Sequence, residues 1–297
     1  MTQTFLVLGA GHSGTSTLSG IINTSPRALC LFEVDFTEGR AGKYRSRYEA
    51  HFDNWDYLFG TSRDIDWSLR ELLKLPGNSY TSVGTKVQEL RFDLLNTRVD
   101  QTFCTVRHPR SWLSHPSTFR SYAVNRGFLH VVIDYVLFID AAIRSGATLF
   151  SLEALYRDPT AWHSALEQRL EGFEVSSQSW WEKMEVDDHV KQSANWLKAH
   201  RTSTRMPEDF RPQLAFADHP NLQQVFSAFD SMETDAGPRE LSQSSRDSLN
   251  ELRTFPSPPA EHLLDTRQPL FLALNSPPKR QIGVIDRVYS WLSGRRK

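Results

Sequence analysis

Short apolar runs alternate with longer stretches of helical periodicity over the first half of the chain. The runs have the length and the flanking turns of strands buried on both faces of a parallel sheet. They occupy residues 4–9, 28–34, 81–86, 101–107 and 147–153. Helices are expected over residues 15–23, in two pieces within 51–75, and over 109–144 and 159–171. This alternation predicts an α/β fold, with a central parallel sheet flanked by helices.

The alternation stops beyond residue 173, where residues 179–200 have a helical pattern and residues 232–259 are rich in serine, proline and charge. We therefore predict a single domain, residues 1–297, with an α/β core at 1–173 and a mostly helical or irregular part at 174–297. Residues 44–67, rich in aromatic and charged side chains, interrupt the core as an insertion between the second and third strands. Parallel sheets bind ligands at the carboxyl ends of their strands, so chemistry is expected just after each run.

The charges almost cancel: 34 lysines and arginines face 35 aspartates and glutamates, a net charge of −1. A bulk nucleic-acid binder would show a basic excess, so no nucleic-acid partner is expected. A local anion pocket needs only a few cations and is not excluded. Cys30 and Cys104 lie in apolar runs and are expected to be buried thiols. With no disulfide framework, no signal peptide and no integral membrane span in the pattern, we expect a cytoplasmic protein.

The sharpest local feature is the string FLVLGAGHSGTSTL at residues 5–18, a strand followed by a glycine turn and the start of a helix. Backbone N–H groups of such a turn, together with the helix N-terminus, form a cradle for an anion. Gly9-x-Gly11-x-x-Gly14 matches a dinucleotide fingerprint, with Glu33 where a ribose-binding acid would follow. Gly9-x4-Gly14 also has P-loop spacing, although Thr15 stands at the lysine position.

The end of the fourth strand helps to separate these alternatives. A nucleotide hydrolase or kinase would place an aspartate here to organise Mg²⁺, whereas this strand ends in Arg107. An arginine at a strand end is suited to an anion. Pro109 then starts a helix that carries Ser114. The chain has only 15 glycines, and the hydroxyls of residues 15–17 do not suit the close helix packing of a dinucleotide fold.

Together these strings resemble the PAPS-dependent sulfotransferase family. HSGTS at residues 12–16 is similar to its loop for the 5′-phosphosulfate of the donor, 3′-phosphoadenosine 5′-phosphosulfate (PAPS). VRHPRSWLS at 106–114 is similar to its 3′-phosphate site, and LFSLEALYRDP at 149–159 and residues 249–259 match further elements. The resemblance implies a P-loop NTPase-like sulfotransferase architecture whose core binds PAPS as the sulfuryl donor without a metal. It implies donor-binding roles for Gly11, His12, Ser13, Gly14, Thr15, Ser16, Arg107 and Ser114.

The same resemblance implies the catalytic roles. Glu33 corresponds to a general base, Lys86 to a cation beside the transferring group and His12 to a contact with the bridging oxygen. Asp35 is an alternative base or a partner of Glu33. Sulfuryl transfer is largely positioning and charge stabilisation, as in phosphoryl transfer.

The chain departs from the family pattern in three places. His12 stands where lysine or arginine is usual, and histidine is only partly charged near neutral pH. The serine after Arg-x-Pro comes one residue early, which leaves His115, or less well Ser117, as an alternative to Ser114. The closing Arg-Lys-Gly string has no clear counterpart, with Lys279 and Arg280 nearest.

The acceptor is a hydroxyl or an amine of a small molecule, a glycan or a lipid. Aromatic residues in 44–67, with Trp180 and Trp181, are candidates to line its slot or to fill the core. The C-terminal part at 174–297 is expected to shape this site. Three alternatives stay open: a P-loop kinase-like phosphotransferase, an oxidoreductase that binds FAD or NAD, and a nucleotide-binding relic without turnover.

Overall fold

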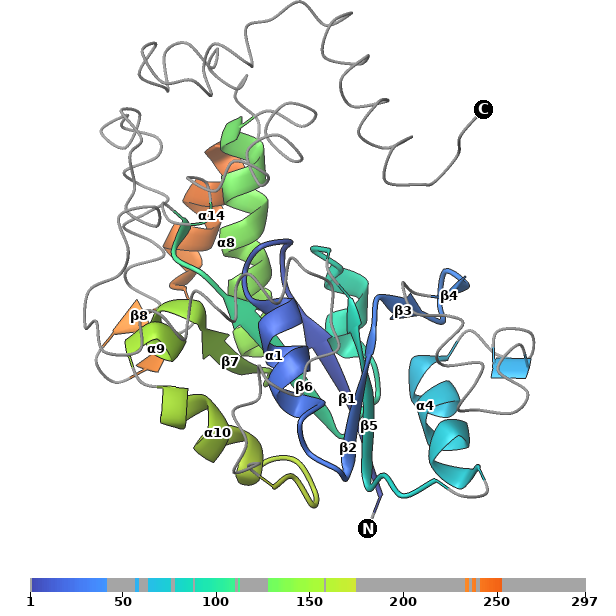
Figure 1. The fold of residues 1–297 in the computed structure, drawn as a ribbon. Coiled ribbons are helices and arrows are strands. Elements are labelled where there is room, and N and C mark those ends of the chain that lie inside the picture. Colours follow the sequence, from blue (N-terminus) through green and yellow to red (C-terminus); the bar gives the residue numbers. More distant parts are fainter. Residues whose placement is uncertain are drawn as a thin grey trace, which may run out of the picture.

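The computed structural model describes residues 2–41, 57–58, 64–75, 78–87, 89–109, 112, 128–157, 159–174, 233–234, 237–238 and 241–252. Five strands form one sheet in which every pairing is parallel (Figure 1). They are β1 (Gln3–Leu8), β2 (Ala28–Phe32), β5 (Ser82–Val87), β6 (Gln101–Val106) and β7 (Thr148–Ser151). All five match the predicted apolar runs to within a few residues, and the α/β class is confirmed.

The strand order is β2-β5-β1-β6-β7, so the third of these strands in the sequence lies between the first two. The first and second strands are therefore not neighbours in the sheet. β5 pairs with both, and Lys86 near its end stands opposite Phe32 of β2 and Val7 of β1. The close fit of β5 on β1 depends on Gly84, because a Cβ there would lie 2.2 Å from a ring carbon of Phe5.

Helices cover both faces of the sheet because every second residue of the central strand points to the same side. Phe5 and Val7 of β1 pack with α1 (Thr15–Ile22), α9 (Leu152–Arg157) and α10 (Pro159–Glu167). Leu6 and Leu8 pack with α4 (Ile65–Lys74), α8 (Phe128–Arg144) and a 3₁₀ helix (Phe92–Asn96). The result is three layers with an apolar core on each side of the sheet.

The predicted helices over 15–23 and 159–171 are confirmed by α1 and α10. Within 51–75, α4 is confirmed, and Asp64 caps it by accepting a hydrogen bond from the Trp67 N–H at 3.1 Å. Part of the span 109–144 is confirmed by α8. The last strand was expected to reach residue 153, but α9 begins at Leu152. The hairpins β3–β4 (Val34–Asp35, Arg40–Ala41) and β8–β9 (Glu233–Thr234, Gly237–Pro238) were not predicted.

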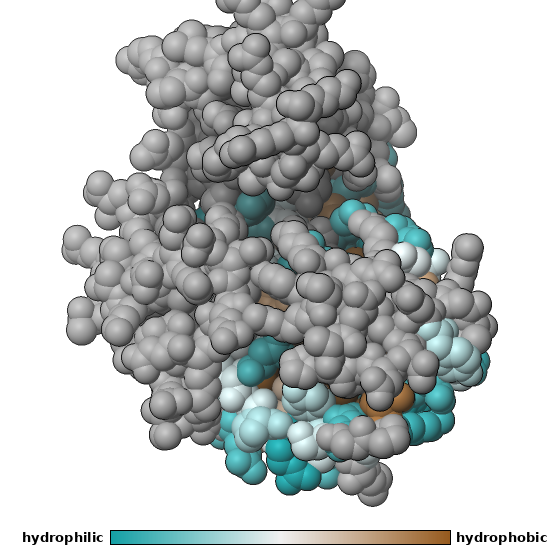
Figure 2. All heavy atoms as spheres, turned by 45° about the vertical axis from the view of Figure 1, so that its right-hand side comes forward, coloured by the Kyte–Doolittle hydropathy of each residue, from teal (hydrophilic) through white to brown (hydrophobic). Residues whose placement is uncertain are grey.

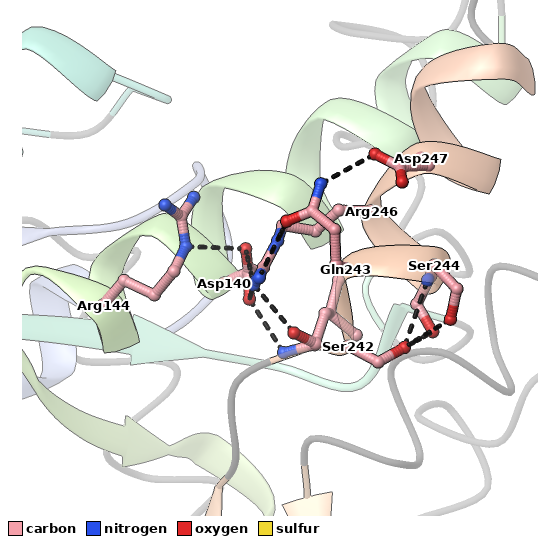
Figure 3. A network of polar contacts seen from close by, with 9 residues as sticks. Asp140, Arg144, Ser242, Gln243, Ser244, Arg246 and Asp247 are labelled. Carbon is pink, nitrogen blue, oxygen red and sulfur yellow. Dashed lines mark hydrogen bonds and ion pairs between the residues drawn. The ribbon is translucent and has the colours of Figure 1, made fainter.

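A helix from the C-terminal part, α14 (Gln243–Leu252), lies against α8 (Figure 1). The contact centres on Asp140 of α8, which is fully buried (Figure 3). Its carboxylate accepts hydrogen bonds from the Leu241 N–H at 2.8 Å and from Arg246 Nη1 at 3.2 Å. Arg144 Nε also reaches it at 3.0 Å. The charged groups of this cluster tie the C-terminal helix to the α/β core.

The visible surface of the described residues is mostly hydrophilic on the face drawn in Figure 2. Among these residues, Tyr57 and Phe92 are the large apolar side chains that are exposed. None of the helices within the described ranges combines the length and the hydropathy needed to cross a membrane.

Candidate functional site

The glycine loop, residues 9–16, connects β1 to α1 through a backbone that two of its glycines make possible. Gly9 has φ 153°, and a Cβ on it would lie 2.4 Å from Thr105 Oγ1 of β6. Gly14 has φ 105° and is the N-cap of α1. No described side chain caps this helix. A helix N-terminus of this kind, with its positive dipole end, suits an anion.

The side chains of Ser13 and Trp112 hold two carbonyl groups of the loop. Ser13 Oγ donates to Ala10 O at 2.7 Å and shares a hydrogen bond of 2.8 Å with Thr105 Oγ1. Trp112 Nε1 donates to Gly11 O at 2.7 Å. The family resemblance implies that Ser13 binds the sulfuryl donor. In the structure its hydroxyl supports the shape of the loop. Because a carbonyl and the next N–H of a trans peptide point in opposite directions, the His12 N–H faces away from Trp112.

A buried cation joins this loop to the end of β2. Lys86 Nζ donates to Ser16 Oγ at 3.0 Å and to Glu33 Oε1 at 3.2 Å. The Lys86 side chain is 1% exposed and that of Glu33 is 22% exposed. The ammonium also lies 5.2 Å from the centre of the Phe32 ring. Although β1 and β2 are not neighbours, Lys86 of the strand between them brings Glu33 and Ser16 to one site.

Two residues of the site have an unusual backbone conformation. Among the described residues, only His12 and Glu33 have a positive φ without being glycine, with values of 66° and 58°. A left-handed conformation costs a residue with a side chain about 1–3 kcal/mol and is often retained at functional sites. Glu33 is held in it by the hydrogen bond from its N–H to Lys86 O, 2.9 Å long.

Asp35, the alternative base, has a different environment from Glu33. It is buried, and its Oδ1 accepts hydrogen bonds from the N–H groups of Thr37 and Glu38. Its Oδ2 forms an ion pair with Arg91 Nη1. With both oxygens engaged in this way, Asp35 fixes the hairpin that follows Glu33. The side chain of Glu33 is 22% exposed and that of Asp35 is 2% exposed, so Glu33 is the more accessible of the two carboxylates.

Arg107 follows β6 and lies beside the glycine loop, as the sequence led us to expect. It is 2% exposed, and its Nη1 donates to His12 O at 3.2 Å. The next residue, His108, donates its N–H to Glu153 Oε1 at 3.0 Å. Ser114, with its alternatives His115 and Ser117, lies outside the described residues. So do Trp180, Trp181, Lys279, Arg280 and most of the aromatic segment at 44–67.

Two aromatic residues of this region, Trp112 and Tyr135, were not predicted from the sequence. The Tyr135 hydroxyl accepts a hydrogen bond from the Arg107 N–H at 2.8 Å and donates one to Arg107 O at 2.7 Å. Burial raises the pKa of Tyr135 well above its ordinary value, so the phenol stays protonated and able to donate. Tyr135 sits in an apolar helical stretch, where its pattern is that of a core residue.

The two cysteines are free and buried, as predicted. Burial raises the pKa of each thiol to about 12. In the part of the chain that the structure describes, no group of three or more His, Cys, Asp or Glu side chains is placed to hold a metal ion.

The loop, the Lys86 bridge and Arg107 together place three cationic or hydrogen-bond-donating elements at the carboxyl ends of β1, β5 and β6. The acid Glu33 faces them from the end of β2. Such a site can hold an anion with two charged ends and can accept a proton next to it. When the chain is compared with models of known protein families and with curated proteins, no significant match is found in either.

Proposed function

We propose that the protein is a sulfotransferase that moves a sulfuryl group from PAPS to a hydroxyl or an amine. The observation that carries this proposal is the buried Lys86 ammonium, which lies between Ser16 of the glycine loop and Glu33. A donor held by the loop and an acceptor activated by Glu33 would meet at this cation. The P-loop NTPase-like architecture, with its glycine loop between β1 and α1, is part of the proposal.

The residues present fit the two charged ends of such a donor. The glycine loop and the N-terminus of α1 suit the 5′-phosphosulfate. Arg107, beside the loop at the end of β6, suits the 3′-phosphate because its guanidinium can form paired hydrogen bonds with phosphate oxygens. The backbone strain at His12 and Glu33 supports a functional role for both.

Each residue then has a distinct task in the transfer. Bound PAPS supplies a sulfur to which the acceptor atom bonds while the S–O bond to the 5′-phosphate breaks, its electron pair staying on the phosphate. Glu33 takes the proton that the acceptor hydroxyl or amine loses. Lys86 offers positive charge to the sulfuryl oxygens, and His12 offers a hydrogen bond to the phosphate oxygen that becomes charged.

The strand order argues against the FAD or NAD alternative. The dinucleotide fold has the order 3-2-1-4-5-6, in which the acid at the end of the second strand lies next to the first strand. Here β5 separates β2 from β1, and Glu33 pairs with Lys86. The kinase alternative is weakened by Thr15 at the usual lysine position and by Arg107 at the strand end. We keep these as outcomes of the binding test.

Isothermal titration calorimetry with 3′-phosphoadenosine 5′-phosphate (PAP), the product of the donor, tests the proposal. We expect micromolar or tighter binding without Mg²⁺, weakened by about one to two orders of magnitude in Arg107→Ala and retained in Glu33→Gln. ATP with Mg²⁺, NAD and FAD are titrated alongside. Binding of Mg-ATP, NAD or FAD without binding of PAP would overturn the proposal.

Turnover is tested by a screen of hydroxyl and amine acceptors with sulfur-labelled PAPS. For any acceptor that is labelled, Glu33→Gln is expected to abolish transfer because the proton acceptor is gone. Glu71→Gln is the matched control, since Glu71 also pairs with a lysine, Lys74 at 2.6 Å, but on the outer surface of α4. Equal turnover in Glu33→Gln and the wild type would show that another group is the base. PAP binding without transfer to any acceptor would favour the nucleotide-binding relic.

A further inference from the structure

Trp112 and Tyr135 form a stacked pair at the junction of the glycine loop, the end of β6 and α8. Their ring centres are 4.3 Å apart and the ring planes differ by 19°. Both side chains are fully buried. A stacked pair of this kind fixes each ring against the other and leaves little freedom to either.

Tyr135 acts on Arg107 through the backbone. Its hydroxyl is bonded to both the N–H and the C=O of Arg107, at 2.8 and 2.7 Å. Two hydrogen bonds to one residue fix the direction in which that residue leaves the strand. The guanidinium that follows is thereby held against His12 O.

Trp112 acts on the loop through a different atom. Its Nε1 donates to Gly11 O, and its own N–H donates to His108 O at 2.8 Å. The indole therefore connects the chain that follows Arg107 to the centre of the glycine loop. Fixing the Gly11 carbonyl also fixes the peptide N–H of His12, which belongs to the same peptide unit.

We propose that Tyr135 and Trp112 are positioning residues that divide the recognition of the nucleotide, Tyr135 setting Arg107 for the 3′-phosphate and Trp112 setting the glycine loop for the 5′-phosphate. This inference rests on the proposed function. Neither residue needs to touch the nucleotide, because each works through a hydrogen bond to the residue that does. The aromatic stack is the common support of the two.

Two nucleotides separate the roles: PAP, which carries both phosphates, and adenosine 5′-phosphate (AMP), which lacks the 3′-phosphate. Calorimetry measures both dissociation constants in one preparation of each variant. Tyr135→Phe keeps the ring and loses both hydrogen bonds, so we expect PAP to bind about tenfold more weakly and AMP to be unchanged within about twofold. Trp112→Phe loses the bond to Gly11 O, so we expect both nucleotides to weaken by a similar factor of about five to ten.

The matched control is Tyr80→Phe, which removes the hydroxyl of a tyrosine that is packed against the core on the α4 face, just before β5 begins and at the opposite end of that strand from Lys86. It is expected to change neither constant. The ratio of the two constants does not depend on the folded fraction of a sample, so partial unfolding cannot imitate the selective effect. If Trp112→Phe does not fold, Trp112→Tyr replaces it.

A second arm uses PAP alone. In an Arg107→Ala background, Tyr135→Phe should weaken PAP no further, since the residue it positions has lost its guanidinium. Equal weakening of PAP and AMP in Tyr135→Phe, or an undiminished effect in the Arg107→Ala background, would overturn the division of roles. Failure of the wild type to bind PAP would instead overturn the proposed function, so the two failures are distinguishable.

Discussion

Lys86 has an environment that departs strongly from what an ammonium prefers. At 1% exposure it has lost most of its hydration, and in a buried ion pair the cost of desolvation can exceed the attraction between the charges. A buried ion pair of this kind is weak evidence for stability, because an apolar side chain of similar volume often serves the fold as well. Natural proteins keep such costs mainly where activity needs them.

The desolvation cost of Lys86 predicts how the stability of the protein responds to substitution of Lys86 or Glu33. Glu33→Gln removes the carboxylate that faces a buried cation and is expected to lower the free energy of unfolding by about 1–3 kcal/mol. Lys86→Met removes the buried cation and leaves a carboxylate that is 22% exposed, so it is expected to cost less than Glu33→Gln, and the double variant, which replaces the whole pair, is expected to be neutral or stabilising. Urea unfolding of the two single variants and of the double variant gives the coupling energy of the pair. A stable Glu33→Gln beside a destabilised Lys86→Met would contradict this account.

At the level of elements, β5 decides how the sheet is assembled and where the site groups lie. It pairs with β1 along its whole length and with β2 from Ser82 to Lys86, and it carries both Gly84 in its middle and Lys86 near its end. Gly84 makes the close approach of β5 to β1 possible, and Lys86 joins Ser16, after β1, to Glu33, after β2. A substitution in this one strand can therefore alter both the packing of the core and the geometry of the site.

Gly84→Ala tests the close approach directly. The added Cβ would lie 2.2 Å from the Phe5 ring and 2.4 Å from Phe5 O, and backbone atoms in a central strand cannot move away cheaply. We expect a loss of about 3 kcal/mol or more, the upper range for an overpacked core. Gly146→Ala is the control, because a Cβ there meets nothing within 4 Å and only the positive φ of 82° opposes it. Equal losses of unfolding free energy in the two variants would refute the packing argument.

The contact of α14 with α8 is a second test at this scale (Figure 3). Arg246 donates to Asp140 and to Leu241 O at 2.7 Å and is 20% exposed, whereas Arg144 is 46% exposed. Arg246→Met is expected to cost about 1–3 kcal/mol because it removes contacts to a buried carboxylate. Arg144→Met should cost less than about 1 kcal/mol, as for an exposed pair. Thermal unfolding that ranks the two the other way would contradict this.

At the scale of the whole molecule, the two apolar cores lie on opposite faces of one sheet, and each contains one cysteine. Cys30 belongs to the core under α1 and α10, and Cys104 belongs to the core under α4 and α8. The reactivity of each thiol therefore reports whether the core on its side of the sheet is open to solvent.

Their raised pKa values, about 12, predict very slow alkylation in the native protein. The thiolate is the reactive form, and at pH 8 a group with such a pKa has about one ten-thousandth of its population ionised. Iodoacetamide labelling followed by mass spectrometry should show both cysteines reacting only on unfolding. If the sheet unfolds as one unit, the two should become reactive at the same urea concentration. Early labelling of one alone would show that its layer opens separately.

The sequence predicted the five strands because each is an apolar run bounded by turn residues, a signal that is local. The strand order could not be predicted in this way, since neighbours in sequence are usually neighbours in space and β1 and β2 are an exception. The placement of Lys86 and Glu33 followed from strand ends, but their contact with Ser16 depends on that order. Trp112 and Tyr135 were missed because a buried aromatic residue in a helix has the same pattern whether it fills a core or supports a loop.

The position of β5 in the chain also has a consequence for biosynthesis. β1 and β2 are complete by Phe32, but neither has a partner until Ser82–Val87 has been made. At about 5–20 residues per second, the ribosome needs several seconds to cover this interval. During that time the nascent chain carries two apolar strands with unpaired edges, which favours engagement by a chaperone. Lys86 then arrives with the strand that joins β1 to β2, so this half of the sheet and the contact between Lys86 and Glu33 form in the same step.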